Sequence, residues 1–392
     1  MTETRPRLKR GHAVLGRVLS LVHLGQVATR ADLTAELGVS RATTGAVTAE
    51  LEALGLIHND TRPGAPATSR GRPSHRIVLD PDGPVVLAAQ VHVDGFRVAV
   101  VGLGGVVVAT AAERSPVGAD PADVLSAVVG AGAELVGGTG RRCVGAGLAV
   151  PSAVSRPGGT ALNPLHLAWP VGAPVLAVFT EQVHRAGLAV PAFVANDVNL
   201  AALAEHRHGA GRGATHLLMT ATGHRGVGGA FVVGGQLYTG SSGLSMEVGH
   251  VTVNPSGRWC HCGNRGCLDV ETDPIGLLEA AGREVRPDVA PLVQAEELVR
   301  DGHPAVRGVV ERLAVGLAGL VNVLNPDRIV LGGLHAALLE REPERLAALV
   351  AGRGLWERSV PLVPAELAHN SLVGAAELAW QPVLDDPLGV LG

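Results

Sequence analysis

Three of the four cysteines of the chain lie within a stretch of eight residues, Cys260 to Cys267, which also contains two glycines. Thiols clustered in a short loop favour a metal site over a disulfide in a chain with no export signal. Tetrahedral Zn²⁺ needs a fourth ligand, and we expect His250 to supply it, since His261 lies between two ligands and can rarely turn its ring to the same ion. Free reduced thiols are the alternative. The predicted ligands of a structural zinc are His250, Cys260, Cys262 and Cys267.

Polar side chains suited to a neutral polyol occur after a predicted strand and on both sides of the cysteine cluster. The dipeptide Asn196-Asp197 directly follows the predicted strand Ala192–Ala195, the usual place for ligand contacts in α/β sheets. Carboxylate and amide oxygens accept hydrogen bonds from hydroxyl groups. Asp197 could instead simply cap the helix predicted after it. The candidate contacts are Asn196, Asp197, Glu247, His250 and Glu271.

The first 80 residues predict a helix-turn-helix. Apolar residues at helical spacing mark His12–Leu24 as a helix, and Thr29 can cap a second helix, Arg30–Leu37. A tight turn follows, and Ser40 can cap a third helix that ends near Leu54.

Short hydroxyl groups and one guanidinium are expected to face outward near the start of the third helix. Such groups suit base edges and phosphates at the N-terminal end of a recognition helix. A small helical bundle with an ordinary capped surface helix is the alternative. The candidate DNA contacts of this helix are Ser40, Arg41, Thr43 and Thr44.

Two predicted strands, Leu56–His58 and Ile77–Leu79, flank a long loop rich in arginine, glycine and proline. Two strands after a recognition helix form a wing. Arg70 and Arg72 in this loop could lie along a narrow minor groove, which attracts guanidinium groups. The alternative is a solvated linker with incidental arginines.

The net charge of −4 argues at first against a nucleic-acid partner for this chain of 392 residues. Residues 1–80, however, carry 11 basic and 7 acidic side chains, a net +4, whereas residues 81–392 carry 21 basic and 29 acidic, a net −8. A basic head on an acidic body is typical of a protein in which one domain binds DNA. No apolar run approaches the roughly 20 residues of a membrane span, and the basic N-terminus leads into amphipathic sequence, so we expect a cytoplasmic protein that contacts no membrane.

The rest of the chain predicts an α/β body of two lobes with a cleft between them. It begins with a meander of short strands and continues with alternating helices and strands. The strands are expected at Val85–Val91, Phe96–Val101, Val106–Ala111, Val144–Val150, Ala192–Ala195, His216–Thr220, Val227–Val233 and Arg328–Leu331, and the helices at Pro121–Val136, Val198–His206 and Val306–Leu324.

Several motifs together resemble the signature of the ROK family (repressors, uncharacterised open reading frames and sugar kinases). The resemblance covers nearly the whole chain and includes the winged helix-turn-helix of the repressor branch. The motifs are the stretch from Gly243 to His250, the run Cys260-x-Cys262-Gly263-x-x-Gly266-Cys267-Leu268-x-x-Glu271, Asn196-Asp197-x-Asn199, and Asn325-Pro326-x-x-Ile329-Val330-Leu331-Gly332-Gly333.

The resemblance implies a winged helix-turn-helix domain at residues 1–80 and, at 81–392, a two-lobed, actin-like ROK domain that binds sugar and forms oligomers. It implies the zinc ligands and the polyol contacts named above, with zinc organising the loop that presents His250 and Glu271. A further sugar contact is expected from the segment before Trp169, where either Asn163 or His166 could take the role.

Departures from the kinase pattern separate repressor from kinase. The kinases carry Asp-x-Gly-Gly-Thr on the first hairpin, where this chain has Gln90-Val91-His92-Val93-Asp94. The side chains of His92 and Val93 would fill the phosphate space, and Asp94 would repel phosphate. The second phosphate loop, Thr220–Gly229, is also irregular. Asp197 occupies the position of the kinase general base, but a base without a phosphoryl donor cannot transfer phosphate.

We therefore expect a sugar-responsive transcriptional repressor of carbohydrate-metabolism genes, without enzyme activity. Its partners would be a double-stranded DNA operator and a small sugar effector. A homodimer or homotetramer would place two heads on half-sites about 34 Å apart or a multiple of that distance. The alternatives are an ATP-dependent sugar kinase with a DNA-binding head and a DNA-binding regulator that has lost ligand control.

Overall fold

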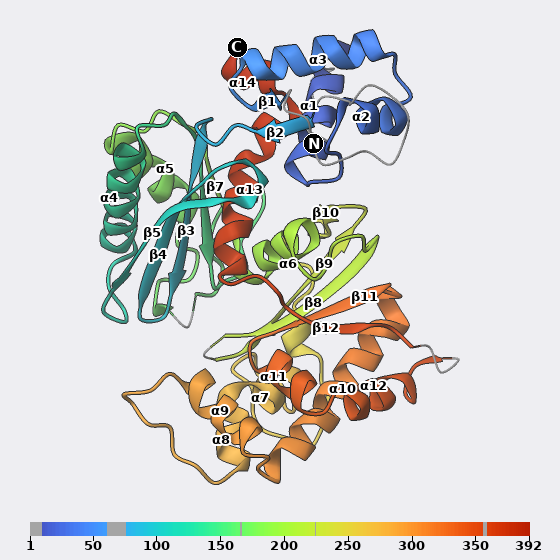
Figure 1. Cartoon of the computed structure of the whole chain (residues 1–392). Helices are drawn as coiled ribbons and strands as arrows, with labels where there is room; N and C mark the ends of the chain where they lie inside the picture. Colours follow the sequence, from blue (N-terminus) through green and yellow to red (C-terminus); the bar gives the residue numbers. More distant parts are fainter. Residues whose placement is uncertain (1–9, 61–75, 165–166, 224, 356–358) are drawn as a thin grey trace. The chain divides into compact units, whose positions relative to one another are not determined.

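The computed structural model describes residues 10–60, 76–164, 167–223, 225–355 and 359–392 (Figure 1). The chain folds into two compact units, each assembled from segments distant in the sequence. Unit 1 comprises Met1–Ala149, Val175–Val194 and Ala375–Gly392, and unit 2 comprises Val150–Pro174 and Ala195–Gly374.

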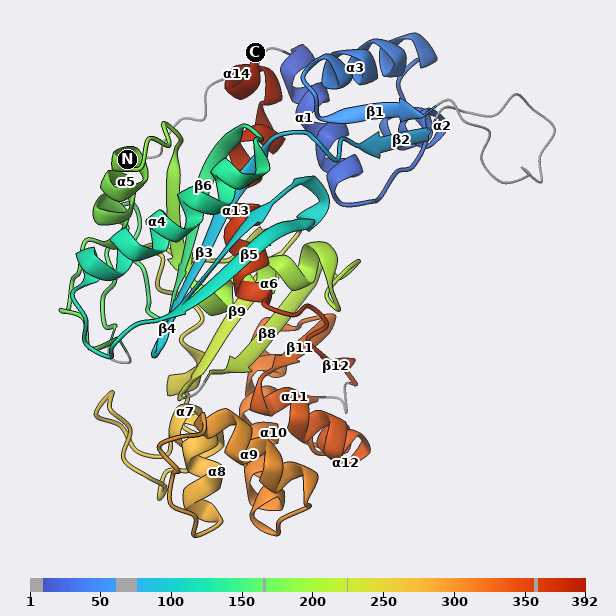
Figure 2. The same ribbon diagram turned by 60° about the vertical axis from the view of Figure 1, so that its left-hand side comes forward.

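The head of unit 1 contains the predicted helix-turn-helix. Thr29 caps the second helix as expected, and Asp32 completes a capping box with it, while Gly38 ends that helix in the left-handed conformation. Two strands follow and pair antiparallel, with Ile57 opposite Leu79 (Figure 2). The elements of the head are α1 (Arg10–His23), α2 (Arg30–Leu37), α3 (Arg41–Ala53), β1 (Ile57–Asp60) and β2 (Arg76–Leu79).

The body of unit 1 is a five-stranded sheet in the order β5-β4-β3-β6-β7. Its first three strands form the predicted antiparallel meander, and β6 lies parallel to β3. Helix α4 packs on one face, where Gly132 meets Leu87, and helix α13 packs on the other, against Gly145 and Gly147. The elements are β3 (Val85–His92), β4 (Gly95–Val101), η1 (Leu103–Gly105), β5 (Val107–Arg114), α4 (Pro121–Thr139), β6 (Cys143–Val150), α5 (Val175–Arg185), β7 (Ala192–Asn196), α13 (Asn370–Asp385, which belongs to unit 1 from Ala375 onward) and α14 (Pro387–Leu391).

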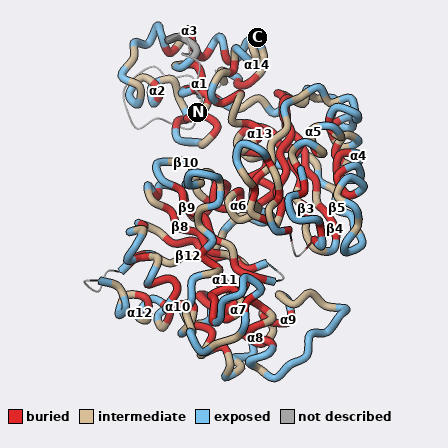
Figure 3. The backbone as a smooth tube through the Cα atoms, turned by 180° about the vertical axis from the view of Figure 1, so that it is seen from behind, coloured by how far each residue is buried: buried red, intermediate tan, exposed pale blue. Residues whose placement is uncertain are grey.

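Unit 2 is built on a second five-stranded sheet, in the order β10-β9-β8-β11-β12. Because side chains alternate along a strand, Leu217 and Met219 of β8 join a core with helix α6 (Asp197–His208), whereas Leu218 joins the core formed with α10 (Ala305–Leu324) and α11 (Leu334–Arg341). Figure 3 shows buried residues concentrated in the strands of both sheets. The strands are β8 (His216–Thr222), β9 (Val227–Val233), β10 (Gln236–Leu237), β11 (Arg328–Gly332) and β12 (Leu362–Pro364).

The helices of unit 2 include several that the sequence analysis did not anticipate, because short helices between polar loops carry too few periodic residues to stand out. In the described part of the chain, no helix is long and apolar enough to span a membrane. The helices are α6 (Asp197–His208), η3 (Val248–His250), α7 (Leu268–Thr272), α8 (Pro274–Ala280), α9 (Pro291–Arg300), α10 (Ala305–Leu324), α11 (Leu334–Arg341) and α12 (Pro343–Ala351).

Close packing of α13 on β6 gives a direct test of the unit 1 fold. A Cβ at Gly147 would lie 2.0 Å from the carbonyl oxygen of Ala375, so Gly147→Ala should lower the free energy of unfolding by about 2–3 kcal/mol. Gly130→Ala is the matched control, since no atom lies within 4 Å of its added Cβ in α4 and alanine favours a helix by up to about 1 kcal/mol. Urea unfolding measures both variants, and equal effects would contradict the packing.

Candidate functional site

The clustered cysteines and His250 converge in unit 2. The Sγ atom of Cys260 lies 3.7 Å from Nδ1 of His250, and the Sγ atoms of Cys262 and Cys267 lie 3.6 Å apart. All four donor atoms lie within 4.8 Å of one another. A tetrahedral ion with Zn–S bonds near 2.3 Å would separate two sulfurs by roughly 3.8 Å. The chain therefore contains a Cys/His cluster that could hold a metal ion.

The turn of the cysteine loop requires a glycine, and a buried thiolate in this loop requires a cation. Gly266 has a φ of 66°, and a Cβ there would lie 1.5 Å from the carbonyl oxygen of Asn254, so only glycine fits this turn. Burial, reinforced by the neighbouring thiols of Cys262 and Cys260, raises the pKa of the Cys267 thiol to about 12. A thiolate at Cys267 consequently needs a positive ion beside it.

His261 belongs to a different group of donors. Its Nδ1 lies 3.7 Å from Oδ2 of Asp269, and these two residues form a possible donor set with Cys260. Among the described residues, the set that includes all three clustered thiols is completed by His250.

Asn196 and Asp197 stand at the junction of β7 and α6. Asn196 is the helix cap: its Oδ1 accepts from the backbone N–H groups of Val198 and Asn199, each at 3.0 Å, and its Nδ2 donates to the carbonyl of Ser152. Asp197 accepts from the N–H of Val198 at 2.8 Å, but burial outweighs this bond and raises the pKa of its carboxyl group to about 6. Asp197 is thus a costly, desolvated acid beside the cap and not the cap itself.

Glu247 and Asp269 form a second acidic group near the metal-ligand cluster. Glu247 directly precedes η3, and partial burial raises the pKa of its carboxyl group; His250 lowers that pKa and the charge of Asp269 raises it. Asp269 is buried on α7, and its Oδ1 accepts from the N–H of Val227 at 2.7 Å. The sequence analysis missed Asp269, although an acid two residues after a predicted metal ligand was a usable signal.

Glycines at the start of β9 bring these groups to the same end of one strand. A Cβ at Gly228 would lie 2.6 Å from a methyl group of Val198 in α6, and one at Gly229 would lie 2.3 Å from a methyl group of Val248 in η3. At Gly249 it would lie 2.2 Å from the carbonyl oxygen of Val227. The end of the segment Thr220–Gly229, which departs from the kinase pattern, therefore packs against the elements that carry Asp197 and Glu247.

Glu271 is placed differently from the other predicted polyol contacts. Its side chain is 4% exposed, and its carboxylate accepts from Asn254, from the backbone N–H of Arg258 and from Nε of Arg312 at 2.8 Å. A carboxylate with these internal donors supports the loop between the metal-ligand residues. The nearby acid with fewer donors is Asp269.

The segment before Trp169 is only partly described. His166 lies outside the described residues. Asn163 is exposed, and its N–H donates to Oγ of Ser152, the residue whose carbonyl accepts from Asn196. Asn163 is therefore tied to the loop beside the start of α6.

The start of α3 presents some of the predicted DNA contacts but not all of them. Ser40, Arg41 and Thr43 are exposed, and Oγ of Ser40 accepts from the N–H of Thr43 at 3.1 Å. The prediction that Thr44 faces outward is wrong: it is 2% exposed, and its hydroxyl bonds to that of Thr34 in α2. Thr44 precedes Val47, Thr48 and Leu51 by three, four and seven residues, which places it on the buried face of the helix. The predicted wing contacts, Arg70 and Arg72, lie outside the described residues.

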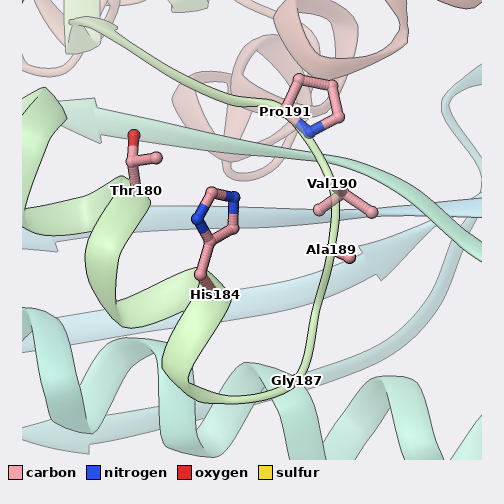
Figure 4. Close-up of a pocket in the computed structure, with 6 residues that line it drawn as sticks. All are labelled: Thr180, His184, Gly187, Ala189, Val190 and Pro191. Atoms are coloured by element: carbon pink, nitrogen blue, oxygen red, sulfur yellow. The ribbon is translucent and has the colours of Figure 1, made fainter.

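Unit 1 carries a pocket of about 470 Å³ that is separate from these groups (Figure 4). The hydroxyl of Thr180 is bonded to the carbonyl of Leu176 in its own helix, so His184 supplies the remaining polar side chain. A binding site normally has several convergent polar groups, and this pocket lacks them. The lining residues are Thr180, His184, Gly187, Ala189, Val190 and Pro191.

A family model described as the ROK family matches residues 91–381. The chain belongs to the ROK family. The match includes Asp197, Glu247, Asp269 and the metal-ligand cluster, and it leaves out the helix-turn-helix of the head.

Relatives of the chain include both regulators and kinases. A protein named putative xylose repressor from Caldicellulosiruptor sp. (strain Rt8B.4) is 29% identical over 55% of this chain and 56% of its own length. A glucokinase from Thermotoga maritima is 30% identical over 54% of this chain and 67% of its own length. The chain thus spans between about half and two thirds of these relatives.

The fold also matches a solved ROK family transcriptional regulator described as a homolog of the E. coli MLC protein. The TM-score is 0.75 at 24% sequence identity, and the match covers 97% of this chain and 98% of that one. The fold of a ROK regulator therefore extends over the head as well as the body.

The two segments that the sequence analysis compared with the kinase pattern make internal hydrogen bonds. In the β3–β4 hairpin of unit 1, Nδ1 of His92, the residue aligned with the first glycine of the motif, lies 2.8 Å from Oδ1 of Asp94. In unit 2, the hydroxyl of Thr222 accepts from the N–H of Leu334 at 2.8 Å, so the first turn of α11 is already hydrogen-bonded within the protein. A helix N-terminus binds an anion through such free N–H groups.

The raised pKa of Asp197 predicts a stability cost at neutral pH. Because the folded pKa of about 6 exceeds the unfolded value near 3.9, the folded state holds this proton more tightly, so the cost grows as pH rises from about 4 and is complete above about 6. Asp197→Asn should raise the free energy of unfolding by about 2 kcal/mol at pH 8 and by much less at pH 4. Urea unfolding at both pH values measures this. A gain of equal size at both would show that the carboxylate is not desolvated.

Proposed function

We propose that this protein is a sugar-responsive, DNA-binding transcriptional repressor of carbohydrate-metabolism genes. The observation that carries the proposal is one chain that combines a capped helix-turn-helix with a body whose desolvated carboxylates remain while its phosphate positions are filled. The relatives named repressors support this reading. We assign DNA binding to residues 1–80 and sugar binding and oligomerisation to residues 81–392.

The head would bind a double-stranded operator through the exposed start of α3. Ser40 and Thr43 offer hydroxyl groups and Arg41 a guanidinium beside the positive end of the helix, an arrangement suited to phosphates and base edges. Arg70 and Arg72 would add minor-groove contacts from the wing. The net +4 of residues 1–80 supports attraction to a phosphate backbone.

The sugar would bind in unit 2, at the end of β9 where the acidic groups gather. Carboxylates that have few internal donors can accept hydrogen bonds from sugar hydroxyl groups, and these bonds offset part of the free-energy cost of desolvating the carboxylates. Glu271, which already accepts from three donors, would hold the loop in place. The proposed contacts are Asn196, Asp197, Glu247, His250 and Asp269, with Asn163 or His166 from the neighbouring segment.

A sugar kinase is the second candidate, and a specific observation favours it. A carboxyl group with a pKa near 6 is suited to act as a general base, and Asp197 has this property. The filled phosphate positions at His92, Asp94 and Thr222 argue against ATP as a donor, so we propose that the protein is not an enzyme.

We assign the metal-ligand cluster to a structural zinc held by His250, Cys260, Cys262 and Cys267. Soft thiolates and imidazole are the ligands that zinc takes in closed tetrahedral sites. Bound zinc would supply positive charge to the thiolates and fix the loop that carries His250. Two copies of the chain, as a homodimer or within a homotetramer, would present two heads to a palindromic operator, in the cytoplasm where that DNA lies.

DNA and sugar binding are tested with the full-length protein. Fluorescence anisotropy on a duplex from its own promoter should show binding that weakens as salt rises, and Arg41→Ala should reduce the affinity by about ten-fold. Arg307→Ala, an exposed arginine of α10, is the matched control and should have no effect.

The effector is sought among D-xylose, D-glucose and N-acetyl-D-glucosamine, the sugars named by relatives of the chain. One of them should release heat on binding, lose that heat in Asp197→Ala, and change operator affinity. No duplex binding even at low salt would refute the proposal. Sugar-dependent ATP hydrolysis that disappears in Asp197→Ala would establish the kinase instead.

Metal analysis tests the zinc assignment. The purified protein should contain about one zinc per chain, and Cys262→Ser should lose it together with about 3 kcal/mol of the free energy of unfolding. Cys143→Ser and His261→Ala are the controls and should keep the metal. Metal loss in His261→Ala but not in His250→Ala would show that the fourth ligand is His261 and not His250.

A further inference from the structure

A buried polar pair joins the DNA-binding head to helix α13, and the proposed function makes no use of it. The side chains of His23 and Glu377 are both fully buried, and Nε2 of His23 lies 2.9 and 3.0 Å from the two carboxylate oxygens. The two residues are 354 positions apart in the sequence. A buried polar pair is held only where its geometry is well satisfied.

The hydrogen bonds of His23 fix the direction of this contact. The backbone N–H of Gly104 donates to Nδ1 at 2.9 Å, so Nε2 carries the proton and donates to Glu377. His23 is the last residue of α1, and Gly104 belongs to η1. A single side chain therefore connects the first helix of the head, the loop after β4 and helix α13.

Close backbone contacts on two sides restrict the later turns of α13. A Cβ at Gly16 in α1 would lie 2.5 Å from the carbonyl oxygen of Asp385, so α1 contacts the backbone at the end of α13. On the sheet side, a Cβ at Gly145 would lie 2.8 Å from the carbonyl oxygen of Ala379. The helix is held between the head and β6 by close backbone contacts.

The first turns of α13 contact the helix that carries the proposed sugar residues. Nδ2 of Asn370 donates to Glu205 in α6 at 3.2 Å, and the fully buried Glu205 carboxylate also accepts from the backbone of Leu367. A Cβ at Gly374 would lie 1.9 Å from the carbonyl oxygen of Leu200. Helix α6 begins at Asp197, about one turn before Leu200 and about two turns before Glu205.

We propose that α13 transmits the state of the sugar site to the DNA-binding head, and that His23 and Glu377 are the positioning residues through which the head receives it. This proposal rests on the proposed function for its biological meaning. Physically, one continuous helix has its first turns fixed on α6 and its later turns fixed on α1. A displacement of α6 on ligand binding would therefore move Glu377, and the directional bond to His23 would carry that movement into α1.

Hydrogen–deuterium exchange on the full-length protein tests the coupling without sugar or DNA. Asn370→Ala loosens the first turn of α13 and should accelerate exchange of the α1 amides by about five-fold. Gly374→Ala displaces the same turn by a different route and should act in the same direction. In a protein that also carries His23→Leu and Glu377→Leu, the acceleration should fall below about two-fold, whereas Glu377→Gln, which keeps an acceptor oxygen, should preserve it.

Asn322→Ala is the matched control for Asn370→Ala. Nδ2 of Asn322 donates to the carbonyl of Arg353, and its Oδ1 accepts from the N–H of Leu355, but Asn322 lies in α10. It should leave α1 exchange unchanged. The coupling is refuted if Asn370→Ala and Gly374→Ala both leave α1 unchanged, or if the acceleration persists without His23 and Glu377.

A second measurement connects the coupling to regulation. For any of the three sugars that changes operator affinity in the unaltered protein, that change should shrink to below about two-fold in the His23→Leu, Glu377→Leu protein, while calorimetry shows unchanged sugar affinity. A full sugar response in that protein refutes the positioning role. If none of the sugars acts on the unaltered protein, the proposed function fails, and the exchange experiment still decides the coupling.

Discussion

Close approach between backbones is the constraint on which the rest of this structure depends. At Gly147, Gly249 and Gly374 an added Cβ would come within 2.2 Å of a carbonyl oxygen of a neighbouring segment. Helix α13 can lie flat on β6 and on α6, and η3 on β9, only because these positions have no side chain. The groups proposed to serve function, from Asp197 to the metal-ligand cluster, are carried by elements placed through such contacts.

The carboxylates of unit 2 divide into two kinds according to their hydrogen bonds. Glu205 and Glu271 accept from several internal donors and therefore hold segments together. Asp197 accepts from the backbone of its own turn, and burial raises its pKa to about 6. A protein retains a group that is destabilising in this way when the group serves binding or catalysis, and the distinction separates the proposed sugar contacts from the scaffold.

Internal hydrogen bonds connect the end of β8 to two neighbouring helices of unit 2. His335 is fully buried, bonded to the hydroxyl groups of Thr220 and Thr272, and burial lowers its pKa to about 3, so its ring is neutral. Together with the bond from Leu334 to Thr222, it connects β8 to α11 and α7. The region is packed structure that links the sheet to the helix following Cys267.

The sequence by itself determined the local features, because these depend on nearby residues. Capping by Thr29 and Ser40, the alternation of the β3 to β5 meander, and the spacing of the clustered thiols all follow from short-range rules, and the structure contains them. Tertiary structure alone decided which polar groups are exposed and which of them come together. Thr44 turned inward because the face that it shares with Val47 and Leu51 packs on α2, and Asp269 joined the acidic group because α7 folds back on β9. The pairing of His23 with Glu377 joins opposite ends of the chain, and no local pattern encodes a contact between residues so far apart.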